Sequence, residues 1–577
     1  MKKSGAWLVR YALEQIGVRY TFGIPGVHNT EIYDELNKSD TVRPVLVTHE
    51  GGAAFMADAI SRTSDSIGTL LIVPAAGVTH AASGIGEAYL DGVPMLIISG
   101  GIRTDTGKSY QLHDVDQHTL LAPITKKTYK IETHEQIVPS IYEAIQIAYE
   151  GVPGPVFIEV PVNLQLFPGE VSEPGPFVAE ANDPSIDLQA IEQAAQALYA
   201  AKRPGFFVGW GAVDASEELI KIAEFLNAPV STTLQGLSTF PANHPLHTGM
   251  SFGKASVPAA ENAFKSCDCM LAVATRFAEI GTGSYGVSPP SELIHIDIDP
   301  KVFNANYPAT ITIEGDARQV LKALFKALVA LGDPKTDKGV LASAIRKDKT
   351  AYYDEWFKHD SKDRVSPARF FAELRKQLDD DAIVVADDGN HTFLTAELMP
   401  IYASRGFISP TDFNSMGYAT PGVTAAKLAN PDKQVVGIIG DGDFLMTCME
   451  TLTASSLGLG GVYFIFNDGE LSQISQAQEI PYNRKTCSIL HEAQFKGVAQ
   501  ATGCEFITIS KTAGCEEGIR QALAYAAQNK PVIVDIKIDY SKRTRFTKGI
   551  VKTNLERFSM GNKVRFVGRA LKRKVTG

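Results

Sequence analysis

Residues 435–472 read VVGIIGDGDFLMTCMETLTASSLGLGGVYFIFNDGELS and contain two apolar runs separated by a helix-forming segment. The first run, Val435 to Gly440, leads into Gly-Asp-Gly, and the second, Val462 to Phe466, leads into Asn-Asp-Gly. β-Branched and aromatic residues fill both runs, so the pattern predicts a strand, a turn, a helix and a second strand. Because the carboxyl ends of parallel strands meet at one sheet edge, we expect Asp441 and Asp468 to lie close together.

Two carboxylates at one sheet edge suit a hard cation such as Mg²⁺, which prefers oxygen ligands and keeps diphosphate oxygens in its shell. Glycines let backbone N–H groups approach the same diphosphate, and Gly440 and Gly442 flank the first aspartate. A lone Gly-Asp-Gly would be read more simply as a turn with a capping aspartate. The second motif at the end of the next strand favours a metal-bridged diphosphate.

The paired motifs resemble the thiamine diphosphate motif of the superfamily that contains acetolactate synthase, pyruvate oxidase and the 2-oxo acid decarboxylases. The resemblance implies that Asp441 and Asp468 bind Mg²⁺, with the backbone carbonyl of Glu470 as the third ligand. The family more often has Asn where this chain has Asp468, and either residue supplies an oxygen ligand. The residues of this turn that are expected to bind the cofactor are Gly440, Asp441, Gly442 and Asp443.

Near the amino terminus, the sequence His-Glu50-Gly-Gly-Ala-Ala places a carboxylate at the start of a helix of small residues. By resemblance, Glu50 contacts the aminopyrimidine ring of the cofactor and is the principal catalytic residue. A carboxyl group that is hydrogen-bonded to a ring nitrogen promotes the tautomer that accepts the proton from the reactive carbon. Burial keeps such a carboxyl protonated near neutral pH. The alternative is a charge that merely complements the helix dipole.

Two further elements of the carboxy-terminal half match the same ligand. The run 383–386 ends in Asp-Asp-Gly-Asn390-His391, a strand leading into a turn where diphosphate contacts are expected. By resemblance, Asn390 and His391 occupy the Gln-His pair of acetolactate synthases. The segment from Asn414 to Tyr418 resembles the family's Gly-Thr-Met-Gly element, in which Met416 supports the bent cofactor while the backbone at Asn414 and Met416 holds the pyrimidine. Without the resemblance, Met416 would be read as core packing.

Three histidines, His28, His80 and His113, are expected in loops near the reactive carbon, where imidazoles transfer protons or orient a carboxylate. We expect His28 and His113 to be catalytic residues that contact the substrate. The chain departs from acetolactate-forming relatives at 74–77 and 112–114. These departures favour a decarboxylase or a less common carboligase over a branched-chain biosynthetic enzyme.

A chain of 577 residues with 44% hydrophobic content is too long for one core. Apolar strand runs alternate with helical segments, which predicts an α/β protein of three consecutive doubly wound parallel-sheet domains. A proline-rich linker, 173–185, separates the first two. The expected domains are a pyrimidine-binding domain at 1–170, a central acetolactate synthase-like domain at 185–335, a diphosphate-binding domain at 365–540, and a basic carboxy-terminal tail at 541–577.

Charge is concentrated in the tail, where Ser541 to Gly577 holds twelve Lys or Arg and one Glu, whereas the whole chain carries −10. This contrast favours docking of the tail on the acidic remainder over a nucleic-acid-binding arm. No apolar run reaches the roughly 20 residues of a membrane span, and no signal-like segment begins the sequence, so we expect a cytoplasmic protein without membrane contact. Six cysteines without zinc spacing are expected to be reduced.

The resemblance implies a lyase or transferase that cleaves a C–C bond of a 2-oxo acid or related α-dicarbonyl, with or without carboligation to an acceptor. It also implies a homodimer with active sites between chains, assembled into a homotetramer. A flavin-containing oxidase or α-diketone-cleaving hydrolase on the same scaffold stays open, as does a non-catalytic paralogue that binds thiamine diphosphate. Gly249 to Gly253 stands where the family has Gly-Met-His-Gly-Thr, and no full GxGxxG follows a strand, so the sequence leaves FAD undecided.

Overall fold

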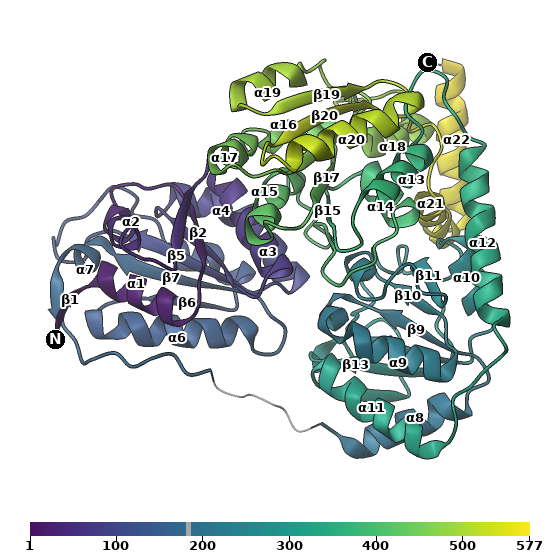
Figure 1. Cartoon of the computed structure of the whole chain (residues 1–577), viewed down its shortest axis with the longest axis horizontal. Helices are drawn as coiled ribbons and strands as arrows, with labels where there is room; N and C mark the ends of the chain where they lie inside the picture. Colours follow the sequence, from purple (N-terminus) through teal and green to yellow (C-terminus); the bar gives the residue numbers. More distant parts are fainter. Residues whose placement is uncertain (180–185, 577) are drawn as a thin grey trace.

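The computed structural model describes residues 1–179 and 186–576, and its main strands form three six-stranded parallel sheets (Figure 1). Helices cover both faces of each sheet, so the expected α/β architecture of three parallel-sheet units is confirmed. The carboxyl half of the expected linker, 180–185, lies outside the described residues. In the part of the chain that the structure describes, no helix is long and apolar enough to cross a membrane.

The first unit is built around a sheet whose central strands are buried along their whole length. Its strands in spatial order are β3 (Arg43–Leu46), β2 (Tyr20–Gly23), β4 (Gly68–Ile72), β5 (Met95–Gly101), β7 (Pro155–Pro161) and β6 (Lys127–Lys130). Its helices are α1 (Gly5–Gln15), α2 (Thr30–Leu36), α3 (Glu50–Thr63), α4 (Ala76–Asp91), α5 (Gln117–Leu121), α6 (His134–Tyr149) and α7 (Val162–Leu166). A short antiparallel pair, β1 (Lys2–Ser4) and β8 (Pro168–Glu170), joins the two ends of the unit.

The central unit repeats the plan with a separate apolar core. Its strands in order are β11 (His247–Met250), β10 (Val230–Thr232), β9 (Pro204–Val208), β12 (Cys269–Val273), β13 (Glu292–Asp297) and β14 (Ile311–Glu314). Its helices are α8 (Leu188–Ala200), α9 (Ser216–Leu226), α10 (Pro258–Phe264) and α11 (Ala317–Leu331). Asp316 caps α11 by accepting from Gln319 N at 3.0 Å. The helix α12 (Val340–Phe357) leads to the third unit.

The third unit contains the opening motif at the middle of its sheet. Its strands in order are β16 (Phe407–Ile408), β15 (Ile383–Ala386), β17 (Val435–Gly440), β18 (Val462–Asn467), β20 (Val532–Lys537) and β19 (Glu505–Ile509). Its helices are α13 (Pro367–Gln377), α14 (Asn390–Leu398), α15 (Ala419–Ala429), α16 (Asp441–Thr447), α17 (Glu450–Leu457), α18 (Ser472–Tyr482), α19 (Phe495–Thr502) and α20 (Cys515–Ala526). The strands β17 and β18 are parallel neighbours, as the sequence predicted.

The single helix expected between these two strands is instead two short helices, α16 and α17, with a break at Cys448–Met449. Side chains on both sides of the break are committed to tertiary contacts. The Thr447 hydroxyl donates to the Gly417 carbonyl at 2.7 Å, and the Glu450 carboxylate accepts from the backbone before α3. In one continuous helix, the helical repeat would fix the directions of these two side chains. The break lets each of them reach its own partner.

Helices of the first and third units share one apolar core. α3 and α4 pack together, and α15 lies against α3 between the two sheets (Figure 1). A buried hydrogen bond also links the first and third units, in which the Tyr418 hydroxyl donates to Asp58 at 2.5 Å. The sheet edges that carry the predicted cofactor residues are therefore held on a common, rigid core.

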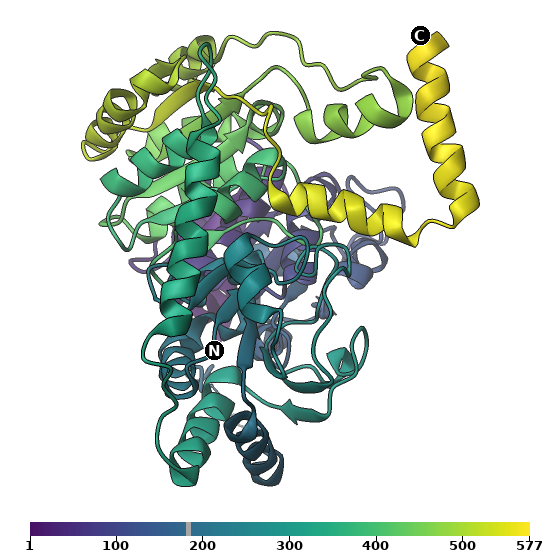
Figure 2. The same cartoon turned by 90° about the vertical axis from the view of Figure 1, so that its right-hand side faces the viewer.

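The basic tail forms two helices, α21 (Arg545–Arg557) and α22 (Met560–Thr576). Figure 2 shows α21 lying along the body of the protein. The chain then changes direction, and α22 runs at an angle to α21. Phe546 is fully buried, with its ring 4.9 Å from that of Phe393 between centroids, and Arg545 pairs with Glu261. The tail thus contacts both the central and the third unit, while α22 packs against α18.

Candidate active site

The two aspartate turns meet at the edge of the third sheet. Asp441 is the first residue of α16 and is 4% exposed. Its Oδ1 accepts from Gly442 N at 2.9 Å, and its Oδ2 accepts from Gly469 N at 2.7 Å, so the carboxylate joins both turns. Burial raises the pKa of Asp441 to about 6, and the charge of Asp468 acts in the same direction.

Two carboxylate oxygens at this edge have no hydrogen-bond partner among the described residues, namely Oδ1 of Asp443 and Oδ1 of Asp468. Burial raises the pKa of both side chains, and neighbouring aspartates raise that of Asp443 further. Largely buried carboxylates that repel one another are stabilised by a cation, so the pair Asp441 and Asp468 fits Mg²⁺. Three converging His, Cys, Asp or Glu side chains are not found in the described ranges. The predicted site needs two side chains and the backbone carbonyl of Glu470.

The side chain of Glu470 makes contacts outside the predicted metal site. Lys485 Nζ lies 2.7 Å from its Oε1, and the Ser475 hydroxyl lies 2.6 Å from its Oε2. Its backbone pairs with Ile489 in an antiparallel bridge. These contacts hold the loop after Asp468 in place. They are compatible with a metal ligand on the backbone of Glu470 and leave its carboxylate out of the site.

Only glycine fits at positions 440 and 442 of this turn. A Cβ on Gly440 would lie 2.3 Å from Asp443 Oδ2, and one on Gly442 would lie 2.5 Å from a methyl group of Leu471. The same position on Gly442 is 3.8 Å from Cε of Met416, so the predicted cofactor support lies beside the turn. Any side chain at either position would collide with these neighbours, so the two glycines allow the turn to pack this closely.

The other predicted cofactor residues approach this turn from β15. Asn390 and His391 begin α14, and His391 Nε2 lies 3.5 Å from Asp443 Oδ2. Burial lowers the pKa of His391 to about 3, so its imidazole is neutral, and Nε2 has no hydrogen-bond partner in the described part of the chain. Asn414 adopts a left-handed backbone conformation with φ of 64° in the loop before Met416.

Asp387 is a residue of this site that sequence reasoning missed. It is fully buried at the end of β15 and accepts from Gly417 N at 2.9 Å and Ala419 N at 2.7 Å. Burial raises its pKa to about 7. These bonds fix the loop that carries Met416 against the strand that carries His391. Its position in the Asp-Asp-Gly after an apolar run was the available signal.

Glu50 is the first residue of α3 and is 7% exposed. Its Oε2 lies 3.0 Å from Nδ1 of His80, whose ring stacks on His49 with 4.6 Å between centroids. His80 was expected in a loop, but it lies in the second turn of α4, where its ring is the partner of Glu50. A Cβ on Gly77 would lie 3.4 Å from Glu50 Oε1, so the start of α4 approaches the carboxyl group closely.

Glu450, at the start of α17, fixes the segment that precedes Glu50. Its Oε1 accepts from the Thr48 hydroxyl at 2.7 Å and from His49 N at 3.0 Å. Gly52 faces the same carboxylate, because a Cβ there would lie 2.4 Å from Glu450 Oε1. Nothing local in the sequence indicates this role, since the partners are about 400 residues apart.

The other two candidate histidines come together. His28, in the loop after β2, and His113, in the loop after β5, have ring centroids 5.0 Å apart. Burial and the neighbouring charge of His113 lower the pKa of His28, and Nδ1 of each ring has no partner among the described residues. His28 also lines a cavity of about 410 Å³ together with Arg103 and Leu112. The pair can therefore accept or donate protons beside a small polar ligand.

Sequence models of three domain families match the chain in order. The amino-terminal thiamine pyrophosphate binding domain matches residues 3–120, the central domain of thiamine pyrophosphate enzymes matches 191–324, and their carboxy-terminal thiamine pyrophosphate binding domain matches 387–536. The three matches fall on the three parallel sheets.

Curated relatives are similar over almost the whole chain. A probable acetolactate synthase large subunit of Methanocaldococcus jannaschii is 32% identical over 93% of this chain and 92% of its own length. The acetolactate synthase large subunit of Corynebacterium glutamicum is 30% identical over 92% and 86%, and isozyme 3 of Escherichia coli is 30% identical over 93% and 95%. The chain therefore belongs to the thiamine pyrophosphate enzymes, in the group that includes the acetolactate synthase large subunits.

Proposed function

We propose that the protein uses thiamine diphosphate and Mg²⁺ to cleave the C–C bond beside the carbonyl of a 2-oxo acid or related α-dicarbonyl. The acyl remainder is then released or added to an acceptor, as the names of the acetolactate synthase relatives suggest. One observation carries the proposal: Asp441 and Asp468, whose carboxyl groups have raised pKa values, meet in two glycine-containing turns at the edge where two parallel strands end. A cation that bridges a diphosphate satisfies both features at once.

Each predicted residue then has a separate task. Asp441, Asp468 and the backbone carbonyl of Glu470 hold Mg²⁺, and the backbone of Gly440 and Gly442 receives the diphosphate. Asn390, His391, Asn414, Met416 and Asp443 complete the cofactor site. When bound, thiamine diphosphate supplies the electron sink for the bond that breaks.

Glu50 holds and transfers the proton that activates the cofactor. Its place at the buried start of α3 and its bond to His80 support this role. From the likeness to the family, we propose a homodimer in which the first unit of one chain faces the third unit of the partner, with two such dimers in a tetramer. His28 and His113 act as catalytic residues at the substrate end, where neutral imidazoles donate or accept protons.

Turnover of a panel of 2-oxo acids, each with and without an aldehyde or second 2-oxo acid, tests this function. We expect activity that depends on both thiamine diphosphate and Mg²⁺ and that falls at least about a hundredfold in Glu50→Gln, because general acid–base groups typically contribute that much. Product analysis separates decarboxylation from carboligation. Unchanged turnover in Glu50→Gln, or none in the wild type with any substrate, contradicts the proposal.

A flavin-containing enzyme on the same scaffold is a second candidate, and one cavity favours it. About 670 Å³ of space lies between the first and central units, with Trp210, Arg276 and Asp297 in its lining. This volume suits a cofactor-sized ligand, and Asp297 ends β13, where nucleotide-binding folds place the carboxylate that holds a ribose. Visible absorption of the purified protein, before and after addition of FAD, tests this candidate. A colourless protein that does not retain FAD contradicts it.

A further inference from the structure

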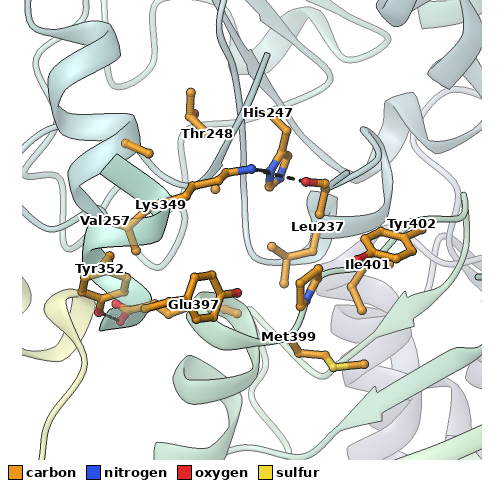
Figure 3. Close-up of a pocket in the computed structure, with 16 residues that line it drawn as sticks. Leu237, His247, Thr248, Val257, Lys349, Tyr352, Glu397, Met399, Ile401 and Tyr402 are labelled. Carbon is orange, nitrogen blue, oxygen red and sulfur yellow. Dashed lines mark hydrogen bonds between the residues drawn. The ribbon is translucent and has the colours of Figure 1, made fainter. Parts of the chain in front are cut away.

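A cavity of about 130 Å³ lies where the central unit meets the third (Figure 3). Its walls are largely apolar, with Leu237 and Val257 from the central unit and Met399 and Ile401 from the third. Lys349 of α12 extends across one side. The lining includes none of the residues assigned above to the cofactor, the metal or the substrate. The cavity is therefore distinct from the site that the proposed function uses.

One end of the cavity is formed by Lys349 and His247. Lys349 Nζ lies 3.1 Å from His247 Nδ1 and donates to the Ala242 carbonyl at 3.3 Å, and Figure 3 shows the Lys349 amine beside the His247 ring. Because an ammonium group can only donate, His247 Nδ1 must accept, which places the proton of the neutral ring on Nε2. Burial is the main cause that keeps the pKa of His247 low.

His247 Nε2 has no hydrogen-bond partner among the described residues, and the side chain is 6% exposed. A buried N–H without an acceptor is rare in folded proteins and marks a place where a ligand or a water accepts from it. Burial also lowers the pKa of Lys349 to about 8. Lys349 Nζ has three donors, and His247 Nδ1 and the Ala242 carbonyl accept two of them, so a negatively charged acceptor at the third would favour the charged amine.

The opposite end is closed by a carboxyl group that already has its donors. Glu397 accepts from Arg545 N at 3.2 Å and Phe546 N at 2.8 Å and from the Tyr352 hydroxyl. Glu397 therefore caps the first turn of α21, and this end of the cavity offers an anion no hydrogen-bond donor. Only the end at Lys349 and His247 suits a carboxylate, so the cavity fixes the direction of an anionic ligand.

An outer groove of about 560 Å³ shares Ala242, Lys349 and Tyr353 with the cavity. Arg346 and His244 line this groove, along with one acid, Asp354. Arg346 and Lys349 are its cationic side chains, and cationic side chains at an entrance raise the local concentration of small anions. Lys349 thus stands between the outer groove and the inner cavity.

We propose that this cavity binds a short-chain monocarboxylate, with its carboxylate on the amine of Lys349 and its alkyl group against Leu237 and Met399. An apolar cavity of about 150 Å³ holds a molecule of benzene size, so a ligand of about six non-hydrogen atoms fits here. The source of such a ligand is either the 2-oxo acid of the proposed reaction or an unreactive carboxylate. Binding in this cavity does not depend on the proposed function.

Calorimetric titration of the full-length protein with sodium propionate tests the proposal, because propionate has the required size and no 2-oxo group. We expect one saturable site per chain in the millimolar range. Propionamide, which has the same shape without the charge, should bind at least about tenfold more weakly, because the charge-assisted bonds are lost. Sodium pyruvate, titrated without added thiamine diphosphate, shows whether a 2-oxo acid occupies the same site by competing with propionate.

Three variants locate the site. Lys349→Met keeps the length of the side chain and should weaken propionate binding at least about tenfold. Ala396→Leu fills the cavity without touching either donor and should do the same. Lys347→Met, on the exposed face of the same helix, is the matched control and should leave binding unchanged. Thermal unfolding confirms that each variant is folded.

Several results overturn the proposal. The first is no saturable propionate binding to the wild type, and the second is equal binding of propionamide. The third is unchanged affinity in both Lys349→Met and Ala396→Leu. The first two results are measured on the wild type, so they test the proposal even if a variant does not fold. None of them bears on turnover, so the proposed function is tested separately.

Discussion

Replacement of Glu450 by alanine tests how the third unit holds the segment that carries Glu50. The substitution leaves the N–H groups of Thr48 and His49 without their acceptor. An orphaned buried donor costs about 1–3 kcal/mol. Because Thr48 and His49 are themselves exposed, water reaches part of the vacated space, so the lower value applies to each. We expect Glu450→Ala to lower the free energy of unfolding by about 2 kcal/mol.

Glu450→Gln is the matched variant for this prediction. Its amide oxygen can occupy the position of Oε1, which accepts from Thr48 and His49, while its amide nitrogen can donate to the Thr453 hydroxyl that now donates to Oε2. The loss should therefore stay below about 1 kcal/mol. Urea denaturation followed by circular dichroism measures both. Equal losses in the two variants, or no loss in either, would refute the reasoning about these bonds.

Two further predictions concern buried charges. Arg62→Leu leaves Asp58 and Asp91 buried without their cation, which now lies 2.6 and 2.9 Å from them, and should cost about 3–5 kcal/mol in urea denaturation. Removal of the exposed Lys38, which also pairs with carboxylates, should change the stability far less. Burial raises the pKa of Glu397 from 4.5 to about 7, so the folded chain keeps a proton that the unfolded chain releases. Stability should fall by about 3 kcal/mol as the pH rises through this range, and thermal unfolding of Glu397→Gln should lack that slope.

Local patterns were sufficient to predict the framework of the site. The apolar runs before Asp441 and Asp468 form neighbouring parallel strands, and the bond from Gly469 N to Asp441 shows that the two turns meet. Glu50 begins a helix of small residues, as expected. These features depend on strand propensity, glycine turns and the geometry of parallel sheets, which a single sequence carries.

Contacts between distant segments could not be predicted in this way. Glu450 meets Thr48, and Lys349 meets His247, only because separate units pack together. The break between α16 and α17 could not be predicted for the same reason, because the residues on either side of it contact other segments of the chain. His80 was assigned to a loop because a single histidine gives no helical period.

Binding of thiamine diphosphate to the wild type and to Asp441→Ala, each with and without Mg²⁺, tests the central claim most directly. Isothermal titration calorimetry gives the affinity without any assumption about the substrate. We expect saturable binding to the wild type only with Mg²⁺, and a loss of affinity of at least about tenfold in Asp441→Ala, because a metal ligand is removed. Binding that is indifferent to Mg²⁺ and to Asp441, or no binding at all, would contradict the account.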